Sequence, residues 1–91
     1  MSSEKPIRFS KHALGNMADR GASTAEVGQA IRTGEQAPAK KGRLSFRKNF
    51  SYNAEWKGKY YQAKQVVPIV AEKADELVVV TVYVFFIGGA E

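Results

Sequence analysis

Cysteine is absent from this 91-residue chain, and histidine and tryptophan each occur only once. Without cysteine the protein forms neither a disulfide framework nor a thiolate metal site. The single histidine, His12, excludes a zinc site built on several imidazoles. The chain also lacks a P-loop, a nucleophile elbow and a dinucleotide-binding fingerprint. The sequence therefore predicts that the protein uses no metal and no cofactor.

Long hydrophobic runs are scarce as well. The longest covers the eleven residues from Leu77 to Ile87, which is too short to span a bilayer. The first ten residues lack the apolar core of a signal peptide. We therefore expect a soluble, cytoplasmic protein that makes no use of a membrane. Its length predicts a single domain over residues 1–91, because a second core would be too small to be stable.

The run from Leu77 to Ile87 is the strongest structural signal in the chain. It is rich in β-branched and aromatic residues and has no Gly, Pro or charge, which is typical of a strand. Apolar side chains on both of its faces predict that both faces are covered. In a simple meander this strand lies at an edge, so either residues 7–9 or a second copy of the chain should pair with it. Strict alternation places on one face Leu77, Val79, Thr81, Tyr83 and Phe85.

Two helices are expected before the sheet. Ser10 is a suitable N-cap for a helix over about 10–21, whose apolar positions follow a helical spacing. Ser23 and Glu26 have the spacing of a capping box, which predicts a second helix over about 24–34. The very short connection between the two helices is typical of a helical hairpin.

Alternating hydrophobicity begins at Arg43, after residues 35–42, which we interpret as a polar connector. It predicts one strand up to a hairpin turn at 56–59 and a second over about 60–70. Pro68 within the second strand predicts an edge, a bulge or a kink. The expected fold class is α+β, with an N-terminal helical hairpin packed on a small, mainly antiparallel sheet. This sheet is a three-stranded meander with a candidate fourth short strand at the N-terminus.

Positive charge is concentrated in the middle of a chain whose net charge is +5. Residues 40–64 hold eight basic side chains against Glu55 alone, interleaved with aromatic residues. This pattern is typical of surfaces that bind nucleic acid or another acidic partner. A solvated basic face without a specific partner is the alternative. The residues that we predict to bind nucleic acid are Arg43, Arg47, Lys64 and Tyr61.

Two short motifs near the N-terminus resemble the opening of a widespread bacterial family of unknown function. They are Phe-Ser-Lys-His-Ala-Leu at 9–14 and Met-Ala-Asp-Arg-Gly at 17–21, and residues 79–83 are similar to the family's closing strand. The family is similar in layout to RelE-like toxins and barnase-like ribonucleases. The resemblance therefore implies a small RNA-cleaving toxin with a RelE-like fold, and an antitoxin protein as its partner. One departure is Asn16, which stands where the family has an arginine and removes a potential phosphate contact.

Three residues are candidates for catalysis. Cleavage of RNA without a metal needs a base for the ribose 2′-OH, an acid for the leaving oxygen and cations for the developing phosphorane charge. We interpret His12 as the base or acid and Arg20 as a phosphate ligand, since they lie on one polar stripe of the first helix. Tyr83 is the third candidate, as a proton donor or a surface for base stacking. A structural role in the first helix is the alternative for His12.

Two functions are consistent with these patterns. The first is a metal-independent endoribonuclease of the toxin type, which the His12 motif favours. The second is a binding module that holds nucleic acid or an acidic protein without chemistry. Asn16 and the lone histidine favour this second function.

Overall fold

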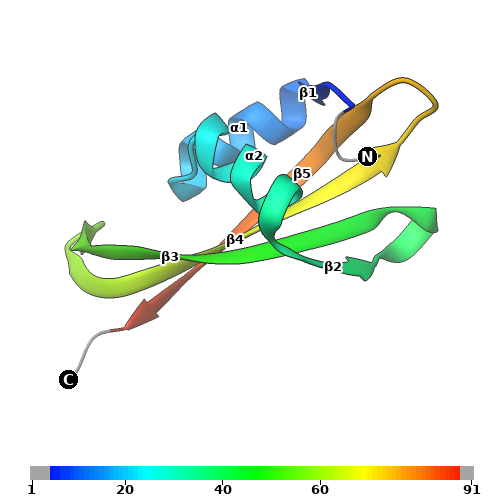
Figure 1. Ribbon diagram of the computed structural model, residues 1–91. Coiled ribbons are helices and arrows are strands. Elements are labelled where there is room, and N and C mark those ends of the chain that lie inside the picture. Colours follow the sequence, from blue (N-terminus) through cyan, green and yellow to red (C-terminus); the bar gives the residue numbers. More distant parts are fainter. Residues whose placement is uncertain (1–4, 89–91) are drawn as a thin grey trace.

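The computed structural model describes residues 5–88, in which two helices pack on one face of a five-stranded sheet (Figure 1). The α+β fold class is as predicted. The strand order is β1-β5-β4-β3-β2, with β1 parallel to β5 and the other pairs antiparallel. In chain order the elements are β1 (Ile7–Phe9), α1 (Lys11–Arg20), α2 (Thr24–Thr33), β2 (Glu35–Pro38), a 3-10 turn (Lys40–Gly42), β3 (Leu44–Trp56), β4 (Lys59–Glu72) and β5 (Leu77–Gly88).

Capping residues define the ends of the helical hairpin, as predicted. The Ser10 hydroxyl accepts a hydrogen bond from the backbone N–H of Ala13 at 3.0 Å, which begins α1. Ser23 and Glu26 form the capping box of α2 in both directions. Gly21 ends α1 in the left-handed conformation, with φ at 82°, so the next helix starts after a very short turn.

Of the two partners predicted for the last strand, residues 7–9 pair with it. Ile7 lies opposite Leu77 in the parallel β1–β5 pair. An ion pair at 3.1 Å between Arg8 and Glu76 lies beside this pairing. The hydrogen bond from Arg8 lowers the pKa of Glu76 below its ordinary value.

The interpretation of residues 35–42 as a polar connector was wrong, because this segment contains β2 and the 3-10 turn. A four-residue polar strand carries no periodic signal, and only its pairing with β3 makes it one. Gly34 allows α2 to continue directly into the sheet. A Cβ on Gly34 would lie 2.6 Å from the carbonyl oxygen of Arg47 and closer still to that of Ala30.

Pro68 lies in β4, an interior strand, and a bulge accompanies it. The pairing of β4 with β5 shifts between Ile69 and Val70, which leaves Val80 as an extra residue in β5. Of the three outcomes predicted for Pro68, the structure therefore has the bulge. Val82, which lies opposite Pro68, directs its backbone groups away from β4 and toward α1. The missing N–H of the proline therefore lies on the side of β3, where the pairing is interrupted between Ser45–Ile69 and Lys48–Val66.

The same bulge changes which side chains of β5 share a face. Val79 and Val82 are both fully buried against the helices, although three positions separate them. Thr81 and Tyr83 consequently lie on the opposite face, where they line a basin with residues of β3 and β4. The predicted grouping of Leu77 and Val79 with Thr81, Tyr83 and Phe85 was wrong for this reason, since strict alternation fails at a bulge.

The hydrophobic core lies between the sheet and the helices. Figure 1 shows both helices on the same side of the sheet, so no described helix covers its other face. None of the helices in residues 5–88 is long and apolar enough to cross a membrane. The buried core residues are Ala13, Met17, Val27, Ile31, Phe46, Val66, Val70, Leu77, Val79 and Val82.

Candidate functional site

An open basin of about 480 Å³ lies on the sheet face that the helices leave uncovered. Its floor is apolar, because Val67 and Ile69 of β4 point into it. None of the residues that line it is acidic. The lining residues are Ala39, Lys40, Lys41, Arg43, Ser45, Val67, Ile69, Thr81 and Tyr83.

The 3-10 turn between β2 and β3 supplies the positive charge at one end of this basin. Lys40 and Lys41 are exposed there, and Arg43 is half-buried beside them. Lys41 has a φ of 62°, so the turn reverses tightly and presents the adjacent lysines together. The result is a cationic rim next to a flat apolar floor.

Aromatic side chains of β5 form the other end. The rings of Tyr83 and Phe85 are stacked with their centroids 6.5 Å apart and 22° between their planes. The two residues are 45% and 54% exposed, which is unusual for large hydrophobic residues in the middle of a strand. They offer a flat, accessible surface of the kind on which nucleobases stack.

Two of the three candidate catalytic residues meet at the margin of this surface. The guanidinium carbon of Arg20 lies 5.3 Å from the centroid of the Tyr83 ring. The Nη1 of Arg20 donates a hydrogen bond of 2.8 Å to the carbonyl oxygen of Val82, which holds the side chain against the edge of β5. A cation and a phenol therefore lie together beside the basin.

His12, the third candidate, is exposed on α1, and its side chain makes no hydrogen bond to another residue in the described part of the chain. Asn16, one helical turn further, has a structural role. Its Oδ1 accepts hydrogen bonds from the Thr81 hydroxyl and, at 3.3 Å, from the backbone N–H of Val82. The amide oxygen thus caps the outer edge of β5.

Lys64 and Tyr61, two predicted nucleic-acid ligands, point to the helix side. Lys64 is buried, with its Nζ 2.9 Å from a carboxylate oxygen of Glu26 and 2.6 Å from the carbonyl oxygen of Gly21. Tyr61 packs against Phe86, with ring centroids 5.1 Å apart. The sequence contained a signal for the buried position of Lys64. Alternate residues of a strand face the same side, and Lys64 alternates with the core positions that follow it in β4.

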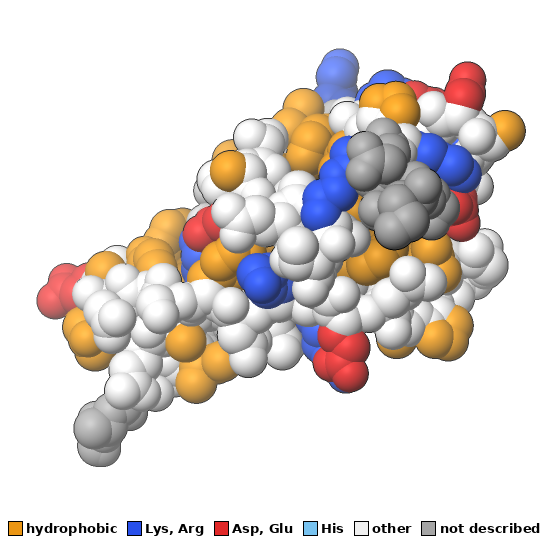
Figure 2. All heavy atoms as spheres, in the orientation of Figure 1, with side chains coloured by type: hydrophobic (Ala, Val, Ile, Leu, Met, Phe, Trp, Pro, Cys, Tyr) orange, Lys and Arg blue, Asp and Glu red, His pale blue; other side chains and the backbone are white. Residues whose placement is uncertain are grey.

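The remaining basic residues of the middle segment do not join the basin. Arg47 is paired with Glu35 at 3.2 Å, on β3 and β2. Lys57 and Lys59 lie over the rings of Trp56 and Tyr61 at the end of the β3–β4 hairpin. Figure 2 likewise shows basic side chains in separate groups on the face in view. Of the predicted nucleic-acid ligands, only Arg43 lines the basin. Lys40 and Lys41, which also line it, were counted in the basic segment but were not named as ligands.

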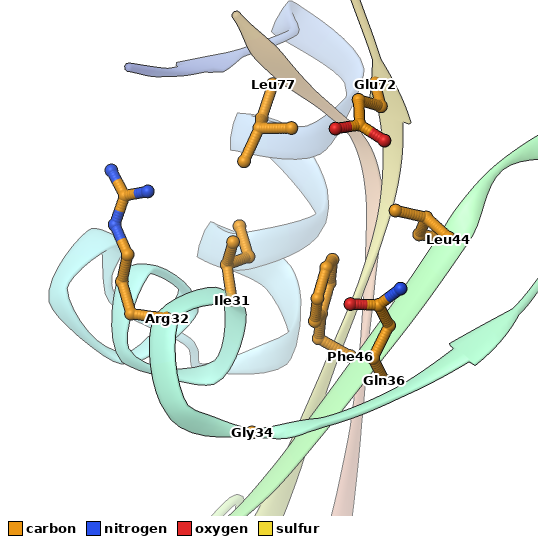
Figure 3. Close-up of a pocket in the computed structure, with 8 residues that line it drawn as sticks. All are labelled: Ile31, Arg32, Gly34, Gln36, Leu44, Phe46, Glu72 and Leu77. Atoms are coloured by element: carbon orange, nitrogen blue, oxygen red, sulfur yellow. The ribbon is translucent and has the colours of Figure 1, made fainter. Parts of the chain in front are cut away.

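A second cavity, of about 210 Å³, opens near the C-terminal end of α2 (Figure 3). Its two charged side chains already have partners. Arg32 donates to the carbonyl oxygen of Lys5 at 2.9 Å, and Glu72 is paired with the ammonium of Lys5 at 3.0 Å. This cavity therefore offers little for recognising a ligand. Its lining residues are Ile31, Arg32, Gly34, Gln36, Leu44, Phe46, Glu72 and Leu77.

Comparison with known proteins identifies a family but no function. Residues 9–84 match the family described as Domain of unknown function (DUF4258). The match extends from the end of β1 into β5 and so includes both helices and the basin. No curated protein and no solved structure matches the chain.

Proposed function

We propose that this chain, which belongs to the DUF4258 family of unknown function, binds single-stranded RNA on the uncovered face of its sheet. The observation that carries the proposal is the basin of about 480 Å³ between Lys40, Lys41 and Arg43 at one end and Tyr83 at the other. It combines phosphate-binding cations with an exposed aromatic pair on one accessible surface.

The chemistry of this surface matches that of a single strand. Each base stacked on an aromatic side chain contributes about 1–3 kcal/mol, and the stacking tolerates any sequence. Bases of a duplex are already stacked, so Tyr83 and Phe85 favour an unpaired strand. The backbone of that strand would run toward the 3-10 turn, where Lys40 and Lys41 neutralise its phosphates. The family that the N-terminal motifs resemble is similar in layout to RNA-cleaving toxins, and this similarity is the reason for naming RNA.

Cleavage of the bound RNA is the second candidate function, and the contact between Arg20 and Tyr83 is the observation that favours it. In such a reaction the 2′-oxygen loses its proton to a base and attacks the adjacent phosphorus. The 5′-oxygen leaves with a proton from an acid, and a 2′,3′-cyclic phosphate remains. Arg20 would stabilise the phosphorane charge, and Tyr83 and the exposed His12 would exchange the protons.

Two double variants test the binding proposal, and each removes two lysines from a different part of the surface. Lys40→Ala with Lys41→Ala removes the rim of the basin, and Lys57→Ala with Lys59→Ala removes two exposed charges at the hairpin end. Fluorescence anisotropy with a labelled single-stranded RNA should show a loss of roughly tenfold or more for the first pair only. The log–log salt slope of the first variant should also shrink by about 1.4, the share of two phosphate contacts on a single strand.

Equal losses from both double variants would show that binding follows net charge alone, and would contradict the proposed surface. The same RNA is then followed for cleavage. If the protein is a ribonuclease, it releases 2′,3′-cyclic phosphate ends, and His12→Ala slows this by roughly two to four orders of magnitude without weakening binding. If the parent binds RNA and releases no such ends, the catalytic candidate is rejected and the binding function stands.

A further inference from the structure

The outer edge of β5 is only partly covered. β1 pairs with its first three residues, Leu77 to Val79. The backbone groups of Val82 are then taken by side chains of α1, because Asn16 accepts from its N–H and Arg20 donates to its carbonyl oxygen. Beyond Val82 no described residue contacts this edge by a hydrogen bond, whereas β4 pairs with the other edge as far as Gly88.

The uncovered stretch has the geometry of a strand that accepts a neighbour. Since the N–H and C=O of Val82 point outward, alternation directs those of Val84 and Phe86 outward as well. The stretch from Tyr83 to Gly88 contains no charge, no proline and no bulge, which are the features that usually protect a sheet edge. It also carries three of the five exposed large hydrophobic residues, Tyr83, Phe85 and Ile87.

The opposite edge of the sheet differs in each of these respects. β2 covers the first part of β3, where Glu35 lies opposite Arg47. The remainder of β3 has a register shift between Ser51 and Ala54 and a positive φ of 49° at Asn53. A bulged, polar edge of this kind resists pairing. The contrast indicates that the β5 edge is an interaction surface.

We propose that the outer edge of β5 pairs with the same edge of a second copy of this chain, antiparallel and about a two-fold axis at Phe85. This register places Phe85 opposite its own counterpart and Tyr83 opposite Ile87 of the other copy, so all three exposed hydrophobic side chains make lateral contacts with apolar neighbours across the pairing. Val84 and Phe86 of the two copies then form the hydrogen-bonded pairs, with about four bonds in all.

A second copy fits this edge better than a charged partner does. The stretch offers no charge for an acidic or basic segment to pair with, and its pattern is complementary to itself. The pairing does not extend further in this direction. The next residue whose backbone groups point outward is Val82, and these groups are already hydrogen-bonded to Asn16 and Arg20. A register centred on Phe86 would leave Tyr83 without an apolar partner from residues 83–88.

The small size of the surface predicts a weak dimer. Six half-exposed side chains of this kind contribute on the order of 600 Å² of buried surface, below the range of stable complexes. We therefore expect a dissociation constant on the order of tens of micromolar or weaker. If RNA binds as proposed above, pairing would join the uncovered faces of two copies into one longer surface; the pairing itself does not depend on RNA.

Single cysteines test the register directly, because the natural chain has none. In Phe85→Cys the two thiols would face each other as a non-hydrogen-bonded pair, where Cβ atoms are about 4.5 Å apart and a disulfide forms readily. Ile87→Cys is the matched control, on the same strand and face, but its counterpart would lie about 13 Å away. Mild oxidation should yield covalent dimer for Phe85→Cys at least tenfold faster than for Ile87→Cys.

Sedimentation equilibrium of the unmodified chain, without RNA, is the second measurement. The apparent mass should rise from monomer toward dimer between about 10 µM and 1 mM, and Phe85→Lys should abolish the rise by setting two ammonium groups face to face. Equal oxidation rates for the two cysteine variants, or a monomeric mass throughout, would overturn the proposal. Both results are independent of whether the protein binds RNA.

Discussion

The role of a basic side chain in this protein depends on the face of the sheet toward which it points. Lys64 and Arg43 both belong to the basic middle segment, and both were predicted to bind nucleic acid. Arg43 lines the open basin. Lys64 faces the helices, where its ammonium lies between the Glu26 carboxylate and the carbonyl oxygen of Gly21. The ion pair therefore links β4 to α2 and stabilises the fold.

Replacing Lys64 by Met tests this role. The variant leaves Glu26 without its partner, and since that carboxylate is 25% exposed the cost should lie below that of a fully buried pair, at about 2–3 kcal/mol. Urea denaturation measures the loss, and Lys59→Met at an exposed position should change stability by less than about 0.5 kcal/mol. If Lys64→Met were as stable as the parent but bound RNA more weakly, Lys64 would be a nucleic-acid ligand, and its structural role would be contradicted.

At the scale of elements, α1 completes the edge of the sheet where β1 stops. The backbone N–H of Ser10 donates to the carbonyl oxygen of Val79 at 3.0 Å. Asn16 and Arg20 then satisfy both backbone groups of Val82. The polar stripe of α1, predicted to face a phosphate, thus makes its contacts mainly with β5, and the edge becomes free only beyond Val82.

Substitution of Asn16 measures what this contact contributes. Asn16→Ala should lower the free energy of unfolding by about 1–3 kcal/mol, because the N–H of Val82 and the hydroxyl of Thr81 lose their acceptor in a half-buried place. Asn16→Asp keeps an acceptor oxygen and should retain most of the stability. Thermal or urea denaturation distinguishes the two. If Asn16→Ala were as stable as the parent while RNA affinity fell, Asn16 would be a ligand rather than an edge contact.

At the scale of the whole molecule, local patterns predicted the helices and the meander, whereas tertiary pairing decided the rest. Capping residues and the change of period are local, and the hairpin turn at Lys57 and Gly58 was placed correctly. β2 exists only through its partner β3. The bulge at Val80 is also a property of pairing, and it moved Thr81 and Tyr83 to the uncovered face.

The candidate site was predictable in part for the same reason. Of the predicted site residues, Tyr83 and Arg43 line the proposed basin and Arg20 lies at its margin. Lys40 and Lys41 were counted in the basic segment but were not named as ligands, because no local pattern distinguishes the rim of a site from a linker. The basic residues of the middle segment do not form one surface in the folded protein, because Lys64 is buried and Arg47 is paired with Glu35. Net charge along the chain therefore overstated the size of the basic surface.

The most direct test of the proposed RNA surface is a titration of the isotope-labelled protein with a single-stranded RNA oligonucleotide, followed by NMR shifts of the backbone amides. Binding to the uncovered face predicts the largest changes at the basin and the aromatic pair, at Lys41, Ser45, Val67, Ile69, Thr81, Tyr83 and Phe85, with little change on the outward surfaces of α1 and α2. Tyr83→Ala should weaken the affinity by roughly fivefold to a hundredfold, the range of one lost stacking contact. Shifts confined to the helices, or no shifts at millimolar RNA, would contradict the proposed surface.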